Sequence, residues 1–460
     1  MKETPKASPP AAGRARTALV LLLLINLFNF VDRQVLAAVV PSIERSFFGG
    51  SGQAHSSGLE ALQEWCRKHL GFQPELAFIG VLSMAFMVLY MIGAPIFGRL
   101  AERYPRWTLV GIGVIAWSLA SGASGLATTF GGLLLTRCFV GIGEAAYGPV
   151  APTILSDLYD VKVRGKILAW FYMAIPVGSA LGYVLGGAVA NSSLGDRSIL
   201  GIHAESWRWA FFLVVPPGLL LGILSFFMKE PPRGASDGLA DAPHGRVRLR
   251  DYGVLLRTPS WVICTLGMTA MTFAIGGIAF WMPYYLAQRP GAPPSATVIF
   301  GGITCVAGLV ATLVGGMAGD RLRARFSGSY FLVSGVAMIA GFPFLLLTLD
   351  APFPRIWIWL SVASFCLFFN TGPTNTILAN VSHPSIRAAS FALNILLIHA
   401  FGDVLSPVVI GVLSDRYNMH FAFVVVGAMF LVAGILWLLG ARYLERDTAL
   451  AATRLADGAK

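Results

Sequence analysis

The sequence contains few charged residues. Only 12% of its 460 residues are Asp, Glu, Lys or Arg, whereas 56% are hydrophobic. Soluble globular domains carry roughly 25% charged residues. This composition argues against a soluble globular protein.

Signatures of catalysis and metal binding are also missing. The sequence has no H-E-x-x-H motif and no phosphate-binding P-loop. Its five cysteines show no C-x-x-C or metal-like spacing: Cys66, Cys138, Cys264, Cys305 and Cys366. We therefore expect no enzymatic activity, no catalytic residue, no metal site, no cofactor and no disulfide framework.

The sequence does contain many long runs of apolar residues. Crossing a bilayer as a helix takes about 20 mainly apolar residues. Twelve such runs occur, at residues 17–40, 76–98, 107–128, 131–156, 165–190, 209–228, 259–287, 296–319, 330–349, 354–381, 387–412 and 419–441. They predict an all-α membrane protein with twelve transmembrane helices, the first being a retained span rather than a cleaved signal.

The net charge of +11 is distributed unevenly. With the N-terminus inside, 24 of the 34 Lys and Arg residues lie in inner segments and eight in outer loops, and Arg33 and Arg137 lie inside spans. This positive-inside bias predicts cytoplasmic N- and C-termini and explains the basic balance without a nucleic-acid partner. The 27 Arg against 7 Lys suggest a GC-rich bacterial genome, and hence a bacterial cytoplasmic membrane.

A polar segment rich in Pro, Gly and Arg divides the spans six and six. We predict an N-terminal bundle at 1–230, a cytoplasmic linker at 231–258, a C-terminal bundle at 259–446 and a cytoplasmic tail at 447–460.

The two halves carry matching loop motifs. A G-x-x-x-[DE]-R pattern follows span 2 and recurs after span 8, and an arginine precedes both span 5 and span 11. The residues are Gly98, Glu102, Arg103, Gly316, Asp320, Arg321, Arg164 and Arg387. Matching offsets indicate a duplicated six-span unit. We interpret the motifs as conformational latches. In such a latch the glycine permits close approach of two helices, and the acid caps a helix or pairs with an arginine. The alternative is a charged turn that only orients the protein in the membrane.

A third similar segment, Gly411 to Arg416, is not counted with these motifs, because the span count places it on the outer face.

With these motifs the chain resembles the major facilitator superfamily over nearly its whole length. Span 4, from Arg137 through Glu144, is similar to that family's R-x-x-x-G-x-G-x-A pattern. Span 5 is similar to its glycine-rich motif, with Gly178, Gly182 and Gly186 on one helix face. The resemblance implies two six-helix bundles around a central cavity, and transport by alternating access.

A narrower resemblance is to the Spinster branch of lysolipid and sphingolipid transporters. It is carried by the stretches 29–33, 141–145, 174–183, 230–234 and 401–407. Two features depart from the superfamily pattern: Glu102 stands where Asp is usual, and Pro105-Arg106-Trp107 replaces a basic pair.

Four charges inside spans form the candidate site. Asp32 and Arg33 lie in span 1, and Arg137 and Glu144 are seven residues apart on one face of span 4, too far for an easy direct pair. Since both spans line the cavity in the family, the resemblance implies a neutral four-charge cluster. We expect Asp32 and Glu144 to exchange protons, and Arg33 and Arg137 to pair with them or bind an anionic headgroup. The alternative is that these charges only fix helix packing.

His399 and Asp403 are four residues apart on span 11 and share a helix face. They are a possible second proton site, or a packing hydrogen bond. Residues 49–75 form an outer-loop insertion whose apolar residues recur at helical spacing, which predicts an amphipathic helix. It would serve as a surface helix, a lid or a foot on the outer leaflet.

Together these features predict a proton-coupled secondary transporter of a lysophospholipid- or sphingolipid-like amphiphile. The alternative is a proton symporter of small organic anions such as sugar acids. We expect a monomer in the lipid bilayer, driven by the proton gradient, with the substrate and protons as its partners.

Overall fold

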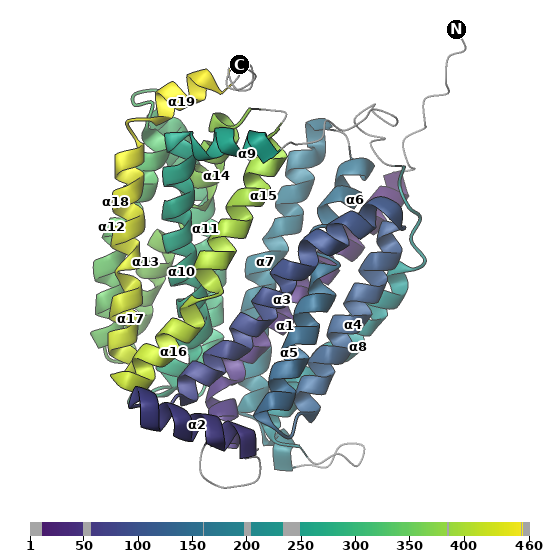
Figure 1. The fold of residues 1–460 in the computed structure, drawn as a ribbon, viewed down its shortest axis with the longest axis vertical. Coiled ribbons are helices and arrows are strands. Elements are labelled where there is room, and N and C mark those ends of the chain that lie inside the picture. Colours follow the sequence, from purple (N-terminus) through teal and green to yellow (C-terminus); the bar gives the residue numbers. More distant parts are fainter. Residues whose placement is uncertain are drawn as a thin grey trace. The chain divides into compact units, whose positions relative to one another are not determined.

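The computed structural model describes residues 12–48, 57–159, 161–196, 204–232, 249–383, 386–451 and 453 (Figure 1). These residues are mostly helical and contain no β-strand. Eleven of their helices are long and apolar enough to cross a membrane. This confirms the predicted all-α membrane fold.

The chain divides into two compact units. The first contains residues 1–56 and 85–244. Its helices are α1 (Ala12–Phe48), the part of α3 (Glu75–Arg103) after residue 84, α4 (Arg106–Leu126), α5 (Phe130–Ala145), α6 (Ala151–Leu158), α7 (Val161–Ala190) and α8 (Ser206–Ser225), with a short 3₁₀ turn at Ser193–Asp196.

The second unit contains residues 57–84 and 245–460. Its longer helices are α2 (Ser57–Leu70), the start of α3, α10 (Pro259–Ala287), α11 (Ala296–Arg323), α12 (Ser329–Asp350), α13 (Ile356–Phe368), α14 (Thr371–Val381), α15 (Arg387–Ile398), α16 (Ser406–Arg416), α17 (Met419–Gly427) and α18 (Met429–Gly440). Two short helices, α9 (Leu249–Leu256) and α19 (Leu444–Leu450), lie in the predicted linker and across the start of the predicted tail. Most of the linker lies outside the described residues.

This division differs from the predicted boundary at residue 230 in one respect. The predicted amphipathic helix α2 and the first turns of α3 group with the second unit. The reason is close backbone packing, because Gly80 of α3 lies against Pro407 and Gly411 of α16 lies against Leu76.

The predicted fourth span is not one helix. Instead of a continuous run over 131–156, α5 ends at Ala145, residues 146–150 form turns, and α6 begins at Ala151. Pro149 has no backbone N–H to donate and Gly148 is a weak helix former, so the helix is interrupted there. Because α5 has 16 residues and α6 has 8, neither is counted among the eleven helices that are long enough to cross a membrane.

Glycines bring α7 against α1 in the first unit. A Cβ on Gly182 would lie 2.5 Å from the carbonyl oxygen of Val31, and one on Gly186 would lie 2.6 Å from the Cβ of Ala38. Gly178 faces the carbonyl of Leu27 in the same way. The predicted glycine face of span 5 is therefore confirmed, and it holds α1 with its charged residues in place.

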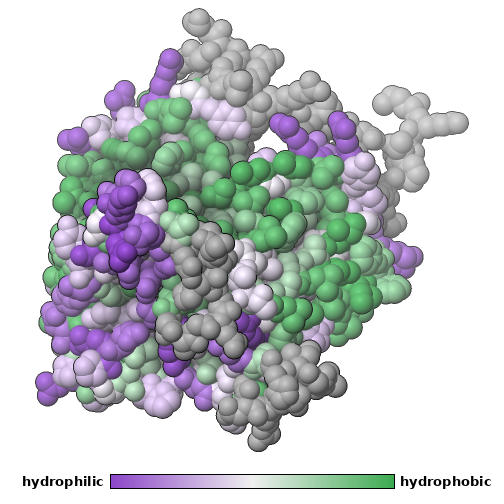
Figure 2. All heavy atoms as spheres, turned by 60° about the horizontal axis from the view of Figure 1, so that its bottom comes forward, coloured by the Kyte–Doolittle hydropathy of each residue, from purple (hydrophilic) through white to green (hydrophobic). Residues whose placement is uncertain are grey.

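Many large apolar side chains are exposed in the middle of long helices. Val306 and Leu313 of α11 are 63% and 68% exposed, and Val336 of α12 is 53% exposed. Figure 2 shows hydrophobic residues covering broad areas of the surface, with hydrophilic residues gathered in separate patches. Such surface is favourable against lipid chains and unfavourable against water.

Candidate functional site

Arg33 of α1 and Glu144 of α5 form a direct ion pair. The Arg33 Nη2 lies 2.6 Å from Glu144 Oε2, and its Nε donates to the same oxygen at 2.7 Å. The Glu144 side chain is fully buried, whereas that of Arg33 is 19% exposed. The two spans thus meet through opposite charges, and the arginine retains limited access to its surroundings.

An aromatic cage surrounds the Arg33 guanidinium. The rings of Phe30, Phe86 and Tyr90 have their centroids 4.9, 5.0 and 5.1 Å from its central carbon. Gly148, in the break of span 4, leaves the space that the Tyr90 hydroxyl occupies. Aromatic faces attract a guanidinium, so the cage fixes Arg33 beside Glu144 without neutralising its charge.

The other two charges are held by serines of α4. Ser121 donates a hydrogen bond to Asp32 Oδ1, and Arg137 Nη2 donates to the hydroxyl of Ser124 at 2.7 Å. Arg137 is only 2% exposed and also interacts electrostatically with Asp32 and Glu144. The structure therefore brings the four predicted residues together, with one direct ion pair, Arg33–Glu144, and with Asp32 and Arg137 each hydrogen-bonded to a serine.

The cluster contains unpaired polar atoms. Among the described residues, Asp32 Oδ2, Glu144 Oε1 and Arg137 Nε are buried and accept or donate no hydrogen bond. Asn29 lies beside Glu144 and is the neighbouring amide that can donate to its carboxylate. An ionised carboxylate only accepts hydrogen bonds, whereas a protonated one also donates. The two unpaired carboxylate oxygens are therefore positions where a proton can be added.

His399 and Asp403 are hydrogen-bonded in the second unit. His399 Nδ1 lies 2.9 Å from Asp403 Oδ2, and both residues belong to a π-helical turn between α15 and α16. Their side chains are 28% and 17% exposed. A π-turn interrupts the regular ladder and is frequent at functional sites. The pair exists as predicted, and its role as a proton site stays a prediction.

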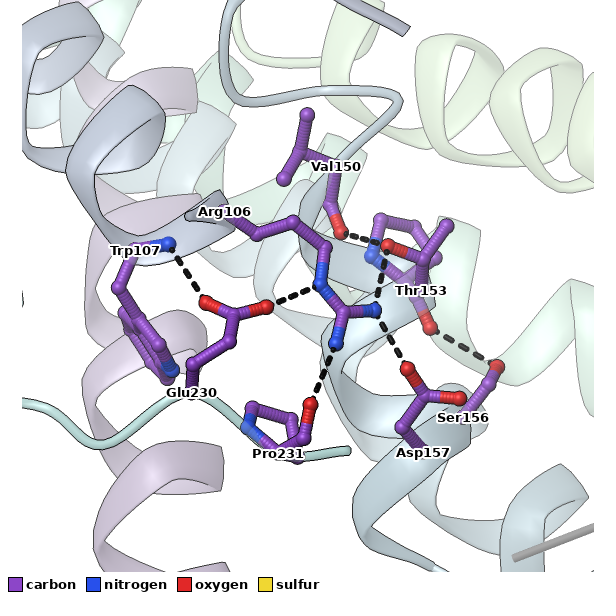
Figure 3. Close-up of polar contacts among 9 residues, drawn as sticks. Arg106, Trp107, Val150, Thr153, Ser156, Asp157, Glu230 and Pro231 are labelled. Carbon is purple, nitrogen blue, oxygen red and sulfur yellow. Dashed lines mark hydrogen bonds and ion pairs between the residues drawn. The ribbon is translucent and has the colours of Figure 1, made fainter. Parts of the chain in front are cut away.

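A second arginine clamp, which the sequence did not single out, lies in the first unit (Figure 3). Arg106 at the start of α4 contacts Asp157 of α6 and Glu230, each at 2.5 Å, and donates to the Pro231 carbonyl at 3.1 Å. Glu230 also accepts from the backbone N–H of Trp107. One guanidinium thus ties α4, α6 and the segment that follows α8 together.

Comparison with known proteins decides the family. The model of the Major Facilitator Superfamily matches residues 22–407. Protein spinster homolog 1 of Homo sapiens is 34% identical, over 89% of this chain and 74% of that protein. Its Xenopus laevis counterpart is 30% identical, over 97% of this chain and 84% of that protein. This chain belongs to the Spinster branch of the Major Facilitator Superfamily.

Two further matches agree with this assignment. The sphingosine-1-phosphate transporter SPNS2 of Danio rerio is 31% identical, over 89% of this Spinster-family chain and 78% of that protein. The crystal structure of a bacterial homolog to the human lysosomal transporter Spinster matches with a TM-score of 0.80 at 21% identity, over 95% of this chain and 99% of that one. The protein is therefore an integral membrane transporter and not an enzyme.

The glycines of the two predicted loop latches have open space beside them in this Spinster-family structure. Among the described residues, a Cβ added at Gly98 or at Gly316 would meet no heavy atom within 4 Å. The Asp320 carboxylate accepts from the Tyr330 hydroxyl at 2.8 Å, next to its own loop. Space for a side chain is thus present at both glycines, although a Cβ on Gly372 of α14 would lie 3.5 Å from the Cα of Gly316. The latch function stays a prediction.

The remaining latch residues give less information. Glu102 and Arg103 end α3, Arg321 lies exposed near the end of α11, and Arg387 is the exposed first residue of α15. Arg164 lies in α7, but its side chain is outside the described residues.

Within the described part of the chain, no group of three His, Cys, Asp or Glu side chains is arranged to hold a metal ion. The five cysteines are free thiols.

Proposed function

We propose that this transporter couples proton movement to the transport of a lysophospholipid- or sphingolipid-like amphiphile. The observation that carries the proposal is the buried Arg33–Glu144 pair, in which one partner is fully buried and the other is partly accessible. Ionisable residues inside spans are costly and mark substrate or ion pathways.

Protonation of Glu144 would release Arg33. A proton added to Glu144 makes the carboxyl neutral, which removes the charge that holds the guanidinium. Arg33 then exchanges Glu144 for an anionic headgroup, since a guanidinium binds phosphate or carboxylate through two parallel hydrogen bonds. Loss of the proton restores the Glu144 pair and displaces the headgroup. Substrate and proton thereby occupy the site together.

Asp32 and Arg137 would contribute to coupling together with Glu144 and Arg33. The Asp32 carboxylate has one oxygen bonded to Ser121 and one unpaired, and Arg137 lies near it without a direct ion pair. Protonation of Asp32 leaves a net positive charge in the four-residue cluster. That charge would favour an incoming anion, in the same direction as the release of Arg33.

Lipid as the substrate class is supported by the relatives. The relative SPNS2 is a sphingosine-1-phosphate transporter by name, and the phosphate of that lipid is the type of group that an arginine recognises. The aromatic rings of Phe30, Phe86 and Tyr90 around Arg33 offer apolar surface for the part of an amphiphile next to its headgroup.

Transport in proteoliposomes tests the proposal. A lysophospholipid and a hexuronate are offered side by side, each with and without an imposed pH gradient. Lysophospholipid uptake that increases with the gradient is expected. Hexuronate uptake alone would contradict the lipid assignment and place the protein among organic-anion symporters. Uptake of lysophospholipid that ignores the gradient would mean that the charge cluster serves as a conformational lock.

The proposal includes the setting in which transport occurs. The protein acts as a monomer in a bacterial cytoplasmic membrane, with both termini in the cytoplasm and no cofactor other than the proton gradient. The distribution of Lys and Arg supports the orientation, and the excess of Arg over Lys supports the bacterial source.

A further inference from the structure

An apolar groove opens on the second unit, where α11 ends, α12 begins and α13 ends. The three helices contact one another, and the groove between them has a volume of about 400 Å³. Sites that take up small ligands have about 300–1,000 Å³. Among the described residues that line the groove none is charged, and they include Leu322, Leu332, Val336, Ala337, Cys366 and Phe369. The groove can therefore hold part of a ligand, and that part must be apolar.

Two close contacts hold the walls of the groove. A Cβ on Gly319 of α11 would lie 2.6 Å from the ring of Tyr330, and a Cβ on Gly341 of α12 would lie 2.8 Å from the Cβ of Cys366 in α13. Tyr330 precedes the lining residues of α12 in the sequence, and Gly341 follows them. Between these two contacts Val336 stays half exposed. The groove is thus bounded by packed helices and open along α12.

Arginines gather at one end of the groove. Arg321 and Arg323 flank Leu322 in the last turn of α11, and Arg325 follows shortly after. The Arg325 backbone N–H donates to the Leu322 carbonyl at 2.9 Å, so this residue lies within one turn of the lining. The Arg323 guanidinium lies 5.3 Å from the ring centroid of Tyr330. All three arginines are exposed, so an accessible positive surface adjoins the apolar groove.

Two carboxylates of the second unit that lie in or beside this loop have other partners. Asp320 accepts from a tyrosine hydroxyl of α12, and Glu445 accepts from a serine hydroxyl of the loop before α12, both at 2.8 Å. Across the described ranges, neither Arg323 nor Arg325 forms an ion pair with a carboxylate. Their charges are therefore available to an anion.

We propose that the groove binds one anionic phospholipid of the surrounding bilayer, with an acyl chain along α12 and the phosphate at Arg323 and Arg325. A guanidinium binds phosphate through paired hydrogen bonds. The predicted orientation places these arginines on the cytoplasmic side, where basic pockets between spans bind anionic headgroups. Since a lipid chain is surrounded by hydrocarbon in any case, the groove adds van der Waals contacts, and the arginines supply the preference for a charged headgroup.

This lipid is a resident ligand and not the transported amphiphile. The groove lies wholly in the second unit, whereas Arg33 and Glu144 lie in the first. The inference needs only the location of the chain in a membrane, and it does not rest on the proposed substrate or coupling ion.

Photocrosslinking with two lipids tests the site. The full-length protein is reconstituted in phosphatidylethanolamine vesicles with a trace of phosphatidylglycerol or phosphatidylcholine that carries a diazirine in its acyl chain. Mass spectrometry then measures crosslinks to residues 332–337 and 365–369. Each arginine beside an anionic headgroup contributes about 1 kcal/mol, which is a factor of about five in affinity. With two arginines we expect phosphatidylglycerol to crosslink about 25-fold more than phosphatidylcholine.

Two sets of variants separate the headgroup from the chain. Arg325→Gln should lower the preference for phosphatidylglycerol about fivefold, and the double variant with Arg323→Gln should abolish it. Arg355→Gln is the matched control, because it removes an exposed arginine at the other end of α13 and should leave the preference unchanged. Ala337→Leu fills the groove and should reduce its crosslinks with both lipids.

Leu313 of α11, which is 68% exposed, provides the internal reference. Ordinary contact with the bilayer should label it equally with both lipids and in all variants. Equal labelling of the groove by the two lipids would overturn the proposal. Near absence of groove labelling by either lipid would also overturn it, because another protein chain would then cover the groove.

Discussion

Removal of Arg106 should weaken the first unit strongly. Its side chain is 5% exposed and bonds two carboxylates, Asp157 and Glu230, whose side chains are 11% and 32% exposed. In Arg106→Ala the Asp157 charge stays buried without its partner, which costs about 3–5 kcal/mol for a buried pair. Glu230 can turn to water and adds little. We therefore expect the free energy of unfolding to fall by about 3–5 kcal/mol.

Unfolding of the purified protein in detergent, followed by tryptophan fluorescence, provides the assay. Arg67→Ala is the comparison, because Arg67 and its partner Glu64 are each 59% exposed and such a pair contributes less than about 1 kcal/mol. Arg106→Lys should be intermediate, since an ammonium cannot present the same fork of donors. Adding Asp157→Asn to Arg106→Ala should recover stability by removing the negative charge that Arg106 balanced. If Arg106→Ala were as mild as Arg67→Ala, the clamp would not hold the helices.

Three smaller predictions use the same preparations. Gly182→Ala, whose new Cβ would lie 2.5 Å from a carbonyl of α1, should lose about 1–3 kcal/mol of stability, whereas Gly98→Ala should lose none. Asp447→Ala leaves the buried backbone N–H of Ser260 at the start of α10 without its acceptor and should cost about 1–3 kcal/mol. His399→Gln should reduce gradient-driven uptake if the His399–Asp403 pair carries protons; unchanged uptake would make it a packing contact.

The charge cluster was predictable because a charge buried inside a span needs a partner of opposite charge close to it. A carboxylate and a guanidinium two turns apart on one span cannot easily pair with each other, so each needs a partner on another helix. Span 1 offers one of each sign, and the structure indeed pairs Arg33 with Glu144. The serines that hold Asp32 and Arg137 were not predictable, since hydroxyls occur throughout apolar helices and only the packing of α4 shows which ones face the charges.

The Arg106 clamp and the break in span 4 were missed for different reasons. In the sequence, Pro105-Arg106-Trp107 stands out only as a departure from a family pattern, and the partners of Arg106 are 51 and 124 residues away. No local signal links such positions. The break at 146–150 did have a signal, the pair Gly148-Pro149, but the continuous apolar composition outweighed it.

The loop motifs show that a shared sequence pattern does not by itself determine which helix contacts form. Gly98, Gly316 and Gly411 share one sequence pattern, yet an added Cβ would meet another helix at Gly411 and no heavy atom of the described residues within 4 Å at Gly98 or Gly316. A pattern states which contacts a segment can form, whereas the conformation decides which of them are made.

Uptake of a lysophospholipid by Glu144→Gln tests the central claim most directly. Glutamine mimics the protonated acid, so this variant cannot gain or lose the proton while Arg33 stays available for the headgroup. The account predicts that wild-type uptake rises with an imposed pH gradient, and that Glu144→Gln still exchanges the lipid but responds much less to the gradient, because only Asp32 can then take up a proton. A Glu144→Gln protein that responds to the gradient as strongly as the wild type would contradict the account, because protonation of Glu144 would then not be what releases Arg33.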